Sequence, residues 1–218
     1  MKKFVCCFLL GCFVMILSSC GDGGVRAPLS DRDFAMEAYT KVLKNEAEFF
    51  STALDENVYL IDYYQEMFVE SNFADDELLA WLNLDFAVVD LDGDGIPEVV
   101  TNALGPYVGE IYHYEDGMVY GFLYGIREMS ALKKDGSFKW SGGMEYNGYG
   151  RLKYSGKECE IINLAVYDLN ISSGEETYQI GEVTVKEEEY EAFRAEQEKK
   201  ANVDWHKLND ENMSTYLR

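Results

Sequence analysis

The fold is decided by the stretch Phe86-Ala87-Val88-Val89-Asp90-Leu91-Asp92-Gly93-Asp94-Gly95-Ile96-Pro97-Glu98-Val99-Val100-Thr101. Two runs of apolar and β-branched residues flank a loop of regularly spaced acids. Such runs favour strands, and Pro97 disfavours a helix, so the loop is predicted to connect two strands. The acids of the loop then lie at one end of a β-hairpin.

The spacing within this loop predicts a calcium site. Calcium takes six to eight oxygen ligands at roughly 2.3 to 2.6 Å, so a short loop must turn several oxygens inward. Asp90, Asp92 and Asp94 would supply ligands one, three and five, and Ile96 would add its carbonyl oxygen. Glu98 would close the ninth position directly or through water. The alternative interpretation is an acidic, Gly-rich turn with no specific ion.

This loop differs from an EF-hand, because position twelve is Thr101 and the flanks are not helical. It resembles instead the strand-loop-strand calcium loops of FG-GAP and VCBS repeats. Those repeats occur in arrays, whereas this sequence contains one clear copy, so a propeller is not expected. The segment 168–172 has a similar start but no closing acid, and it is predicted to be an Asx-rich turn.

The amino terminus has the pattern of an export signal. Met1-Lys2-Lys3 is charged, and the apolar run that follows, 4–17, is shorter than the ~20 residues of a membrane-spanning helix. The run ends in Leu17-Ser18-Ser19-Cys20, which resembles the lipobox of bacterial lipoproteins, whose cysteine is diacylated. Residues 1–19 are therefore predicted to be a signal peptide and 20–29 a tether. An ordinary signal peptide or an uncleaved anchor is the alternative.

The resemblance implies a protein anchored to the cell membrane through lipid on Cys20, with the folded part facing outside. Two acyl chains satisfy the requirement of stable anchoring for two hydrophobic signals. The formal net charge of -21 argues against nucleic acid as a partner and favours a basic or neutral one. We expect an extracellular protein or glycan in that role.

The remainder, 30–218, is predicted to be a single α+β domain, since 47% of the chain is apolar and its length allows one sizeable core. Helices are expected over 31–54, 75–82 and 186–200, with a short one from Asp210 to about Leu217. Segment 57–68 fits either helix or strand, and Asp116-Gly117 predicts a hairpin turn. The strands expected in one antiparallel meander are 86–90, 98–103, 110–114, 118–122, 137–140, 150–155, 159–167 and 176–185.

Cys159 is the one cysteine left in the predicted domain, so no disulfide can form within it. It lies in a predicted strand, where an unpaired cysteine is usually a small core residue. Calcium would then supply stability that exported domains often take from disulfides, because an ion that binds only the folded state stabilises it.

The order of elements also resembles small lipoproteins of Gram-positive anaerobes that carry one such calcium loop. The resemblance rests on the stretch from Val89 to Glu98 and on two further motifs, His113-Tyr114-Glu115-Asp116-Gly117 and Trp140-Ser141-Gly142-Gly143. It implies no catalytic activity.

Enzymatic chemistry receives little support from the residues. His113 and His206 are the only histidines, and neither lies in a nucleophile or metalloprotease motif. Both are interpreted as surface or structural residues, and no catalytic residue is assigned. Paired carboxylates of a glycan or peptide hydrolase remain the alternative, because such pairs are defined by distance in space. A two-lobed solute receptor would need more chain.

A binding module is the favoured function. Trp140, Tyr146 and Tyr149 lie in a Gly-rich segment, where exposed rings could stack on a sugar or hold a peptide. For these three rings themselves, the favoured interpretation is that they are core and hairpin residues. An exposed patch joining the three would favour binding, whereas two facing acids in a cleft away from Asp90 would favour a hydrolase.

Overall fold

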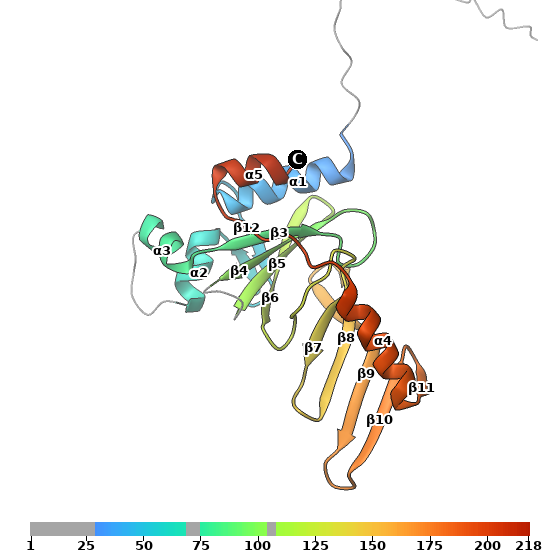
Figure 1. Ribbon diagram of the computed structural model, residues 1–218. Helices are drawn as coiled ribbons and strands as arrows, with labels where there is room; N and C mark the ends of the chain where they lie inside the picture. The colour runs from blue at the N-terminus through green and yellow to red at the C-terminus, as the bar shows by residue number, and fades with distance from the viewer. Residues whose placement is uncertain (1–28, 69–74, 104–107) are drawn as a thin grey trace, which may run out of the picture.

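The computed structural model describes residues 29–68, 75–103 and 108–218, and within them helices and strands form an α+β fold, as predicted (Figure 1). The strands form two sheets. The seven-stranded sheet runs, in spatial order, β12 (His206–Lys207), β3 (Asp85–Val89), β4 (Glu98–Ala103), β5 (Val108–Glu115), β6 (Met118–Gly125), β1 (Phe49–Ser51) and β2 (Glu56–Val58). The five-stranded sheet runs β11 (Val183–Val185), β10 (Glu175–Ile180), β9 (Glu158–Asn170), β8 (Tyr146–Ser155) and β7 (Phe138–Ser141).

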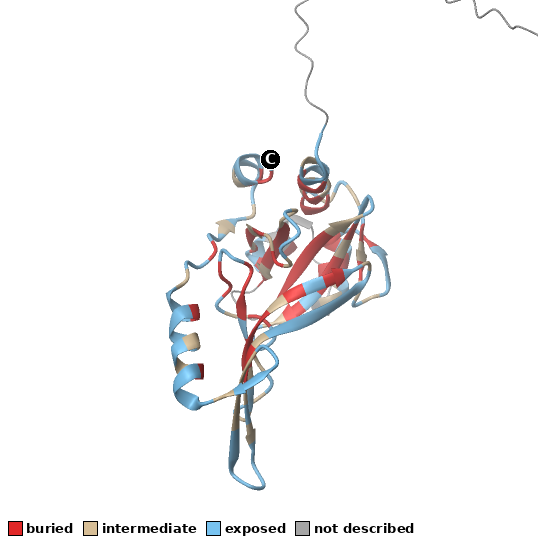
Figure 2. Ribbon diagram, turned by 90° about the vertical axis from the view of Figure 1, so that its right-hand side faces the viewer, coloured by how far each residue is buried: buried red, intermediate tan, exposed pale blue. Residues whose placement is uncertain are grey.

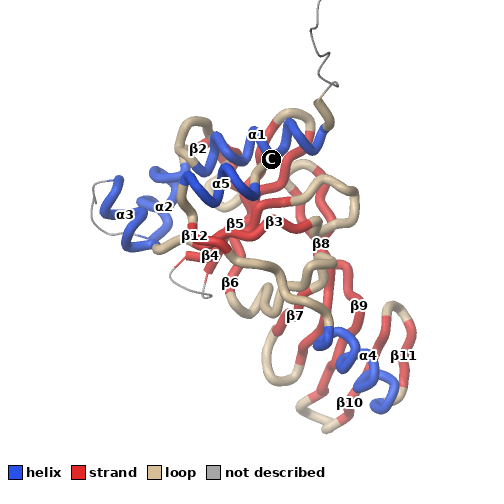
Figure 3. Tube along the Cα trace, turned by 45° about the horizontal axis from the view of Figure 1, so that its top comes forward, coloured by secondary structure: helices blue, strands red, loops and turns tan. Residues whose placement is uncertain are grey.

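Four helices cover one face of the seven-stranded sheet. They are α1 (Asp31–Leu43), α2 (Leu60–Phe68), α3 (Asp75–Leu82) and α5 (Asp210–Tyr216), and α1 lies beside α5 (Figure 3). Their buried side chains form one cluster with side chains of the sheet, including Met36, Tyr39, Leu78, Phe86 and Tyr112. This face is therefore sealed by helices.

The opposite face of the seven-stranded sheet is covered by β7 and β8. Phe138, Trp140 and Leu152 from these strands pack into a second cluster with Val100 and Ile111. The five-stranded sheet continues past this contact, and its hairpins far from the seven-stranded sheet are exposed (Figure 2). The fifth helix, α4 (Glu187–Lys199), packs beside that part of the sheet through a small cluster that contains Tyr190 and Ala165.

Helix α1 begins as predicted but ends early. The Ser30 hydroxyl accepts a hydrogen bond from the Asp33 amide, and the Asp33 carboxylate accepts one from the Ser30 amide, which forms a capping box. The helix ends at Leu43, because Asn45 adopts a left-handed φ of 59° and turns the chain. The predicted helix over 31–54 is therefore wrong beyond Leu43, where β1 and β2 follow.

Strand β1 also breaks the predicted single meander. Strands β3 to β6 do form an antiparallel meander, and Asp116 and Gly117 form its last turn with φ of 51° and 85°. Strand β1, however, pairs in parallel with β6. The remaining predicted strands belong to a separate sheet, so one meander is corrected to two sheets.

Smaller predictions have mixed outcomes. Segment 57–68 contains the end of β2 and all of α2, and the expected strand over 176–185 is divided by a turn at Gly181. The last helix exists, but its N-cap is Asn209 rather than Asp210. Cys159 is exposed on β9, so its prediction as a core residue is wrong. It lies in the first half of β9, where six successive residues are exposed.

Candidate metal centre

The acidic loop connects β3 to β4 at one end of the seven-stranded sheet. Val89 pairs with Glu98 at the last step of the ladder, and the residues between them form the loop. Gly93 and Gly95 have φ of 87° and 89°, a left-handed conformation that favours glycine. These two turns explain why the sequence needs glycine at its fourth and sixth loop positions.

The loop brings three carboxylates together. One carboxylate oxygen from each of Asp90, Asp92 and Asp94 lies within 4.8 Å of the others. Like charges this close repel by about 1 kcal/mol per pair even in a water-like dielectric. A cation among them would offset this repulsion, so the described residues form a group that could hold a metal ion.

Backbone amides fix these carboxylates in place. Asp90 Oδ1 accepts from the Gly93 amide at 2.6 Å, and Asp90 Oδ2 accepts from the Gly95 amide at 3.1 Å. Asp92 Oδ1 accepts from the Asp94 amide at 3.1 Å, and Asp94 Oδ1 accepts from the Ile96 amide at 2.6 Å. A carboxylate has about four lone-pair sites, so capacity remains for an ion. The donor set is all oxygen, which suits a hard cation.

Glu98 lies deeper than the other acids of the loop. It is fully buried at the start of β4, where Oε2 accepts from the Leu91 amide at 2.7 Å and Oε1 lies 3.0 Å from His113 Nδ1. Burial raises the pKa of Glu98 to about 7, and its contacts with His113 and Leu91 oppose that rise. Both of its oxygens already have protein partners. Its role as the calcium ligand at the ninth loop position therefore stays a prediction.

His113 is the residue that sequence reasoning missed at this site. Asp92, Glu98 and His113 form a second group whose ligand atoms lie within 4.8 Å of one another. The His113 ring is buried and stacks on Tyr154 with centroids 4.2 Å apart. Glu98 and His113 meet across β4 and β5, and their register follows from sheet pairing rather than from a local motif. The expectation of a satisfied structural histidine is met, and its place beside the metal group is new.

A turn from outside the loop packs against it. Gly136, with a φ of 79°, lies so close to the Asp90 carbonyl oxygen that any Cβ there would clash. Asp135 beside it forms ion pairs with Lys200 at 2.7 Å and Arg151 at 3.5 Å. Burial would raise the pKa of Asp135, but hydrogen bonds from Lys200 and Ser137 outweigh it and lower the pKa to about 2. The loop is therefore supported by a rigid, charged turn.

Trp140, Tyr146 and Tyr149 do not form the exposed aromatic patch that would have favoured binding at this segment. Trp140 is 7% exposed in the cluster between the sheets, and Tyr149 is 6% exposed in the cluster under α4. Tyr146 is exposed, and its ring centroid lies 4.8 Å from that of Trp140. Trp140 and Tyr149 are thus core residues on two different faces, so the three rings cannot act as one exposed surface.

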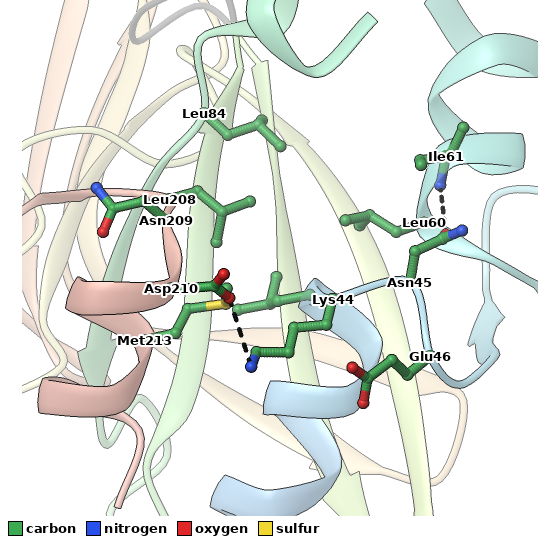
Figure 4. A pocket seen from close by; sticks show the side chains of 11 residues that line it. Lys44, Asn45, Glu46, Leu60, Ile61, Leu84, Leu208, Asn209, Asp210 and Met213 are labelled. Atoms are coloured by element: carbon green, nitrogen blue, oxygen red, sulfur yellow. Dashed lines mark hydrogen bonds and ion pairs between the residues drawn. The ribbon is translucent and has the colours of Figure 1, made fainter. Parts of the chain in front are cut away.

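A cavity of about 580 Å³ lies between α1, α2 and α5, away from the metal loop (Figure 4). Leucine and methionine side chains form its apolar lining, including Leu84 and Met213. Its polar groups contact one another, since Lys44 pairs with Asp210 at 3.4 Å and the Asn45 side chain accepts from the Ile61 amide at 3.0 Å. This cavity is best described as a seam between packed helices.

Comparisons with known proteins add no relative. No protein-family model matches the chain, and searches of curated proteins and of solved structures find no match either. Among the described residues, no helix is long and apolar enough to cross a membrane. The predicted signal peptide and Cys20 lie outside the described residues, as does the tether up to residue 28.

Proposed function

We propose that this chain is a lipid-anchored cell-surface protein whose folded part is a calcium-stabilised interaction module. The observation that carries the calcium proposal is the convergence of Asp90, Asp92 and Asp94 in a loop whose amides hold each carboxylate. Calcium is favoured over a softer ion because this group offers oxygen ligands alone.

The anchor proposal rests on the lipobox-like stretch Leu17-Ser18-Ser19-Cys20. Its test is independent of calcium. Replacing Cys20 by Ser should release the protein from the membrane fraction, because the acylated sulfur would be lost. Cys159→Ser is the matched control and should leave the protein in the membrane fraction. Retention of the Cys20→Ser variant in membranes would contradict the anchor.

The experiment for calcium is a melting curve of the purified protein in chelator, in millimolar magnesium and in millimolar calcium. A ligand present at 100 times its Kd stabilises by about 2.7 kcal/mol, which corresponds to roughly 5–10 °C for a chain of this length. We expect that rise with calcium and little change with magnesium.

Variants connect the calcium effect to the loop. Asp92→Asn should remove most of the calcium-dependent rise, because Asp92 belongs to both groups of candidate ligands. Asp168→Asn is the control, since Asp168 lies on β9 in the other sheet. Equal melting temperatures of the unsubstituted protein in calcium and in chelator would refute the calcium site.

A hydrolase is the second candidate, because Glu176 and Glu191 line one cavity away from Asp90. Glycoside hydrolysis requires one carboxyl that donates a proton. Glu176 accepts hydrogen bonds from Tyr167 and Tyr178, and Glu191 pairs with Arg194 at 3.0 Å. Both carboxylates are thus held by side chains around the cavity, so the geometry supports binding better than hydrolysis.

A further inference from the structure

A cavity of about 380 Å³ lies between α4 and the face of the five-stranded sheet that points away from the seven-stranded sheet. Its lining includes four tyrosines from four different elements, namely Tyr149, Tyr167, Tyr178 and Tyr190. The volume is within the range of about 300–1,000 Å³ that is usual for small-molecule sites. It suits a ligand of one or two rings better than a folded partner.

Three of the four tyrosine rings form a continuous aromatic wall. The ring centroids of Tyr167 and Tyr178 are 5.5 Å apart, and those of Tyr178 and Tyr190 are 5.4 Å apart, whereas the Tyr149 ring contacts Phe193 of α4 at 6.0 Å. Tyr167 and Tyr178 are only partly buried, so ring surface remains at the cavity. Such faces offer a large apolar contact area that is already ordered before a ligand arrives.

One hydroxyl beside this wall lacks a partner. Tyr149 is 6% exposed, and its hydroxyl is buried with no hydrogen-bond partner among the described residues. Buried polar groups are almost always hydrogen-bonded, so this orphan is an unmet hydrogen-bonding capacity. Tyr149 lines the cavity, and because its hydroxyl is closed to solvent, a small movement of the lining is needed before a ligand hydroxyl can pair with it.

The charged side chains that line the cavity are of both signs, which favours a neutral ligand. Glu176 and Glu191 are acceptors, whereas Lys139, Asn147 and Arg194 provide donors. The net charge of -21 opposes an anion, and the two cations in the lining oppose a cation. A neutral polyhydroxylated molecule can use donors and acceptors together.

We propose that this cavity binds one or two sugar residues of a neutral glycan, which stack on the tyrosine wall and hydrogen-bond to Tyr149. The inference rests on the proposed interaction module and assigns it a ligand class. The proposal is binding without cleavage, because Glu176 and Glu191 are each already held by side chains around the cavity.

The test is calorimetric titration of the purified protein with maltotriose, xylotriose and the trisaccharide of N-acetylglucosamine. Trigalacturonate and choline serve as charged probes. We expect at least one neutral trisaccharide to bind and the charged probes not to bind. Binding of a charged probe alone, or of no probe, would overturn the proposal.

Variants locate the binding site within the molecule. Tyr149→Phe removes only the orphan hydroxyl, and loss of one hydrogen bond should weaken saccharide binding about fivefold. Arg194→Gln tests the donor side at an exposed position that carries little risk to folding. Tyr154→Phe is the matched control, because its hydroxyl is also buried and unpartnered but belongs to the cluster between the sheets. Equal affinity of the Tyr149→Phe and Arg194→Gln variants with the unsubstituted protein would refute this site.

The outcomes separate this inference from the calcium proposal. A calcium-dependent rise in melting temperature without saccharide binding would refute the glycan cavity and leave the calcium loop intact. Saccharide binding without any calcium effect would refute the calcium loop and leave the glycan cavity intact. Cleavage of a bound trisaccharide would refute binding without hydrolysis and support the hydrolase alternative.

Discussion

The two sheets of this molecule are buried to very different degrees. Strand β4 of the seven-stranded sheet has five of its six residues buried, whereas β9 of the five-stranded sheet has two of thirteen buried. Helices and strands β7 and β8 cover the first sheet from both sides, and only part of the second sheet is covered. Burial on two faces fixes the strands that flank the acidic loop, while partial cover of the second sheet leaves surface exposed.

This difference predicts where a substitution is costly. A change inside the seven-stranded sheet disturbs side chains and backbone that cannot rearrange, because packed interiors have little free space. A change on the outer part of the five-stranded sheet meets solvent. A pair of matched variants, one at a tightly packed position and one at a more exposed position, tests each prediction.

The largest effect is expected at Gly136, where the turn packs against the metal loop. Gly136→Ala adds overpacking of about 1–3 kcal/mol to left-handed strain of about 1–3 kcal/mol, so we expect a loss of about 4 kcal/mol. Gly174→Ala in the outer hairpin has similar φ, 71°, and no atom within 4 Å of its Cβ. It should cost about 1 kcal/mol in urea unfolding. Equal losses would contradict the tight contact with Asp90.

The next effect concerns the two histidines, each of which stacks on a tyrosine. His113→Phe would leave the buried Glu98 without its side-chain partner, at a cost of about 3 kcal/mol. His206 stacks on Tyr216 with centroids 3.6 Å apart and is only partly buried, so His206→Phe should cost less than 1 kcal/mol. Thermal unfolding at pH 8 in chelator measures both without a contribution from ions. A larger loss at His206 would reverse the comparison.

A pH effect is expected from Glu110, which is buried under α2 and accepts a hydrogen bond from the Tyr63 hydroxyl at 2.5 Å. Burial raises the pKa of Glu110 to about 8, so the folded state binds this proton more tightly than the unfolded state. Stability should therefore fall as pH rises from the ordinary range of a carboxyl, near 4.5, to about 8.

The variant Glu110→Gln isolates this contribution. It should reduce the loss of stability between pH 6 and pH 8 by about 2 kcal/mol in denaturant unfolding. Glu176 also accepts from tyrosine hydroxyls but is exposed on the five-stranded sheet, and Glu176→Gln should leave the pH slope unchanged. An unaltered slope in Glu110→Gln would show that this carboxyl does not titrate in the window.

The smallest effect is expected at Cys159. It is exposed on β9, so Cys159→Ser should change the free energy of unfolding by less than about 0.5 kcal/mol. Val166→Ser on the same strand is the buried counterpart and should cost several times more, since it lies in the cluster between the sheets. A large loss at Cys159 would restore its interpretation as a core residue.

Local signals in the sequence predicted local structure well. The capping box at Ser30 and the turn at Asp116-Gly117 both form, because each depends on residues a few positions apart. The hairpin around Asp90 follows for the same reason. The predicted helix was wrong beyond Leu43 because the structure there depends on pairing with a distant strand. Phe49 and Phe50 fit a helical period, yet Phe50 pairs with Tyr120 of β6. No pattern near residue 50 encodes that partner.

At the candidate sites, too, only the residues that a local motif positions could be predicted from the sequence. The three aspartates could be found from their spacing, since the loop itself positions them. His113 could not, because its meeting with Glu98 requires the register of β4 against β5. Tyr149 was selected for its aromatic character, but the cavity that it lines depends on α4 packing against β8 to β10. Residues joined by tertiary packing were thus missed or misplaced.

The turn at Gly136 also contacts both candidate sites. On one side it packs against the acidic loop, and on the other Asp135 and Lys133 hold Lys200 and the last carbonyls of α4, the helix that lines the tyrosine cavity. Occupancy of either site that stiffens this turn lowers the entropic cost of filling the other. Such coupling is reciprocal, so whatever factor calcium applies to glycan affinity, the glycan must apply to calcium affinity. If both proposals hold and the turn couples the sites, the glycan should bind more tightly in calcium than in chelator.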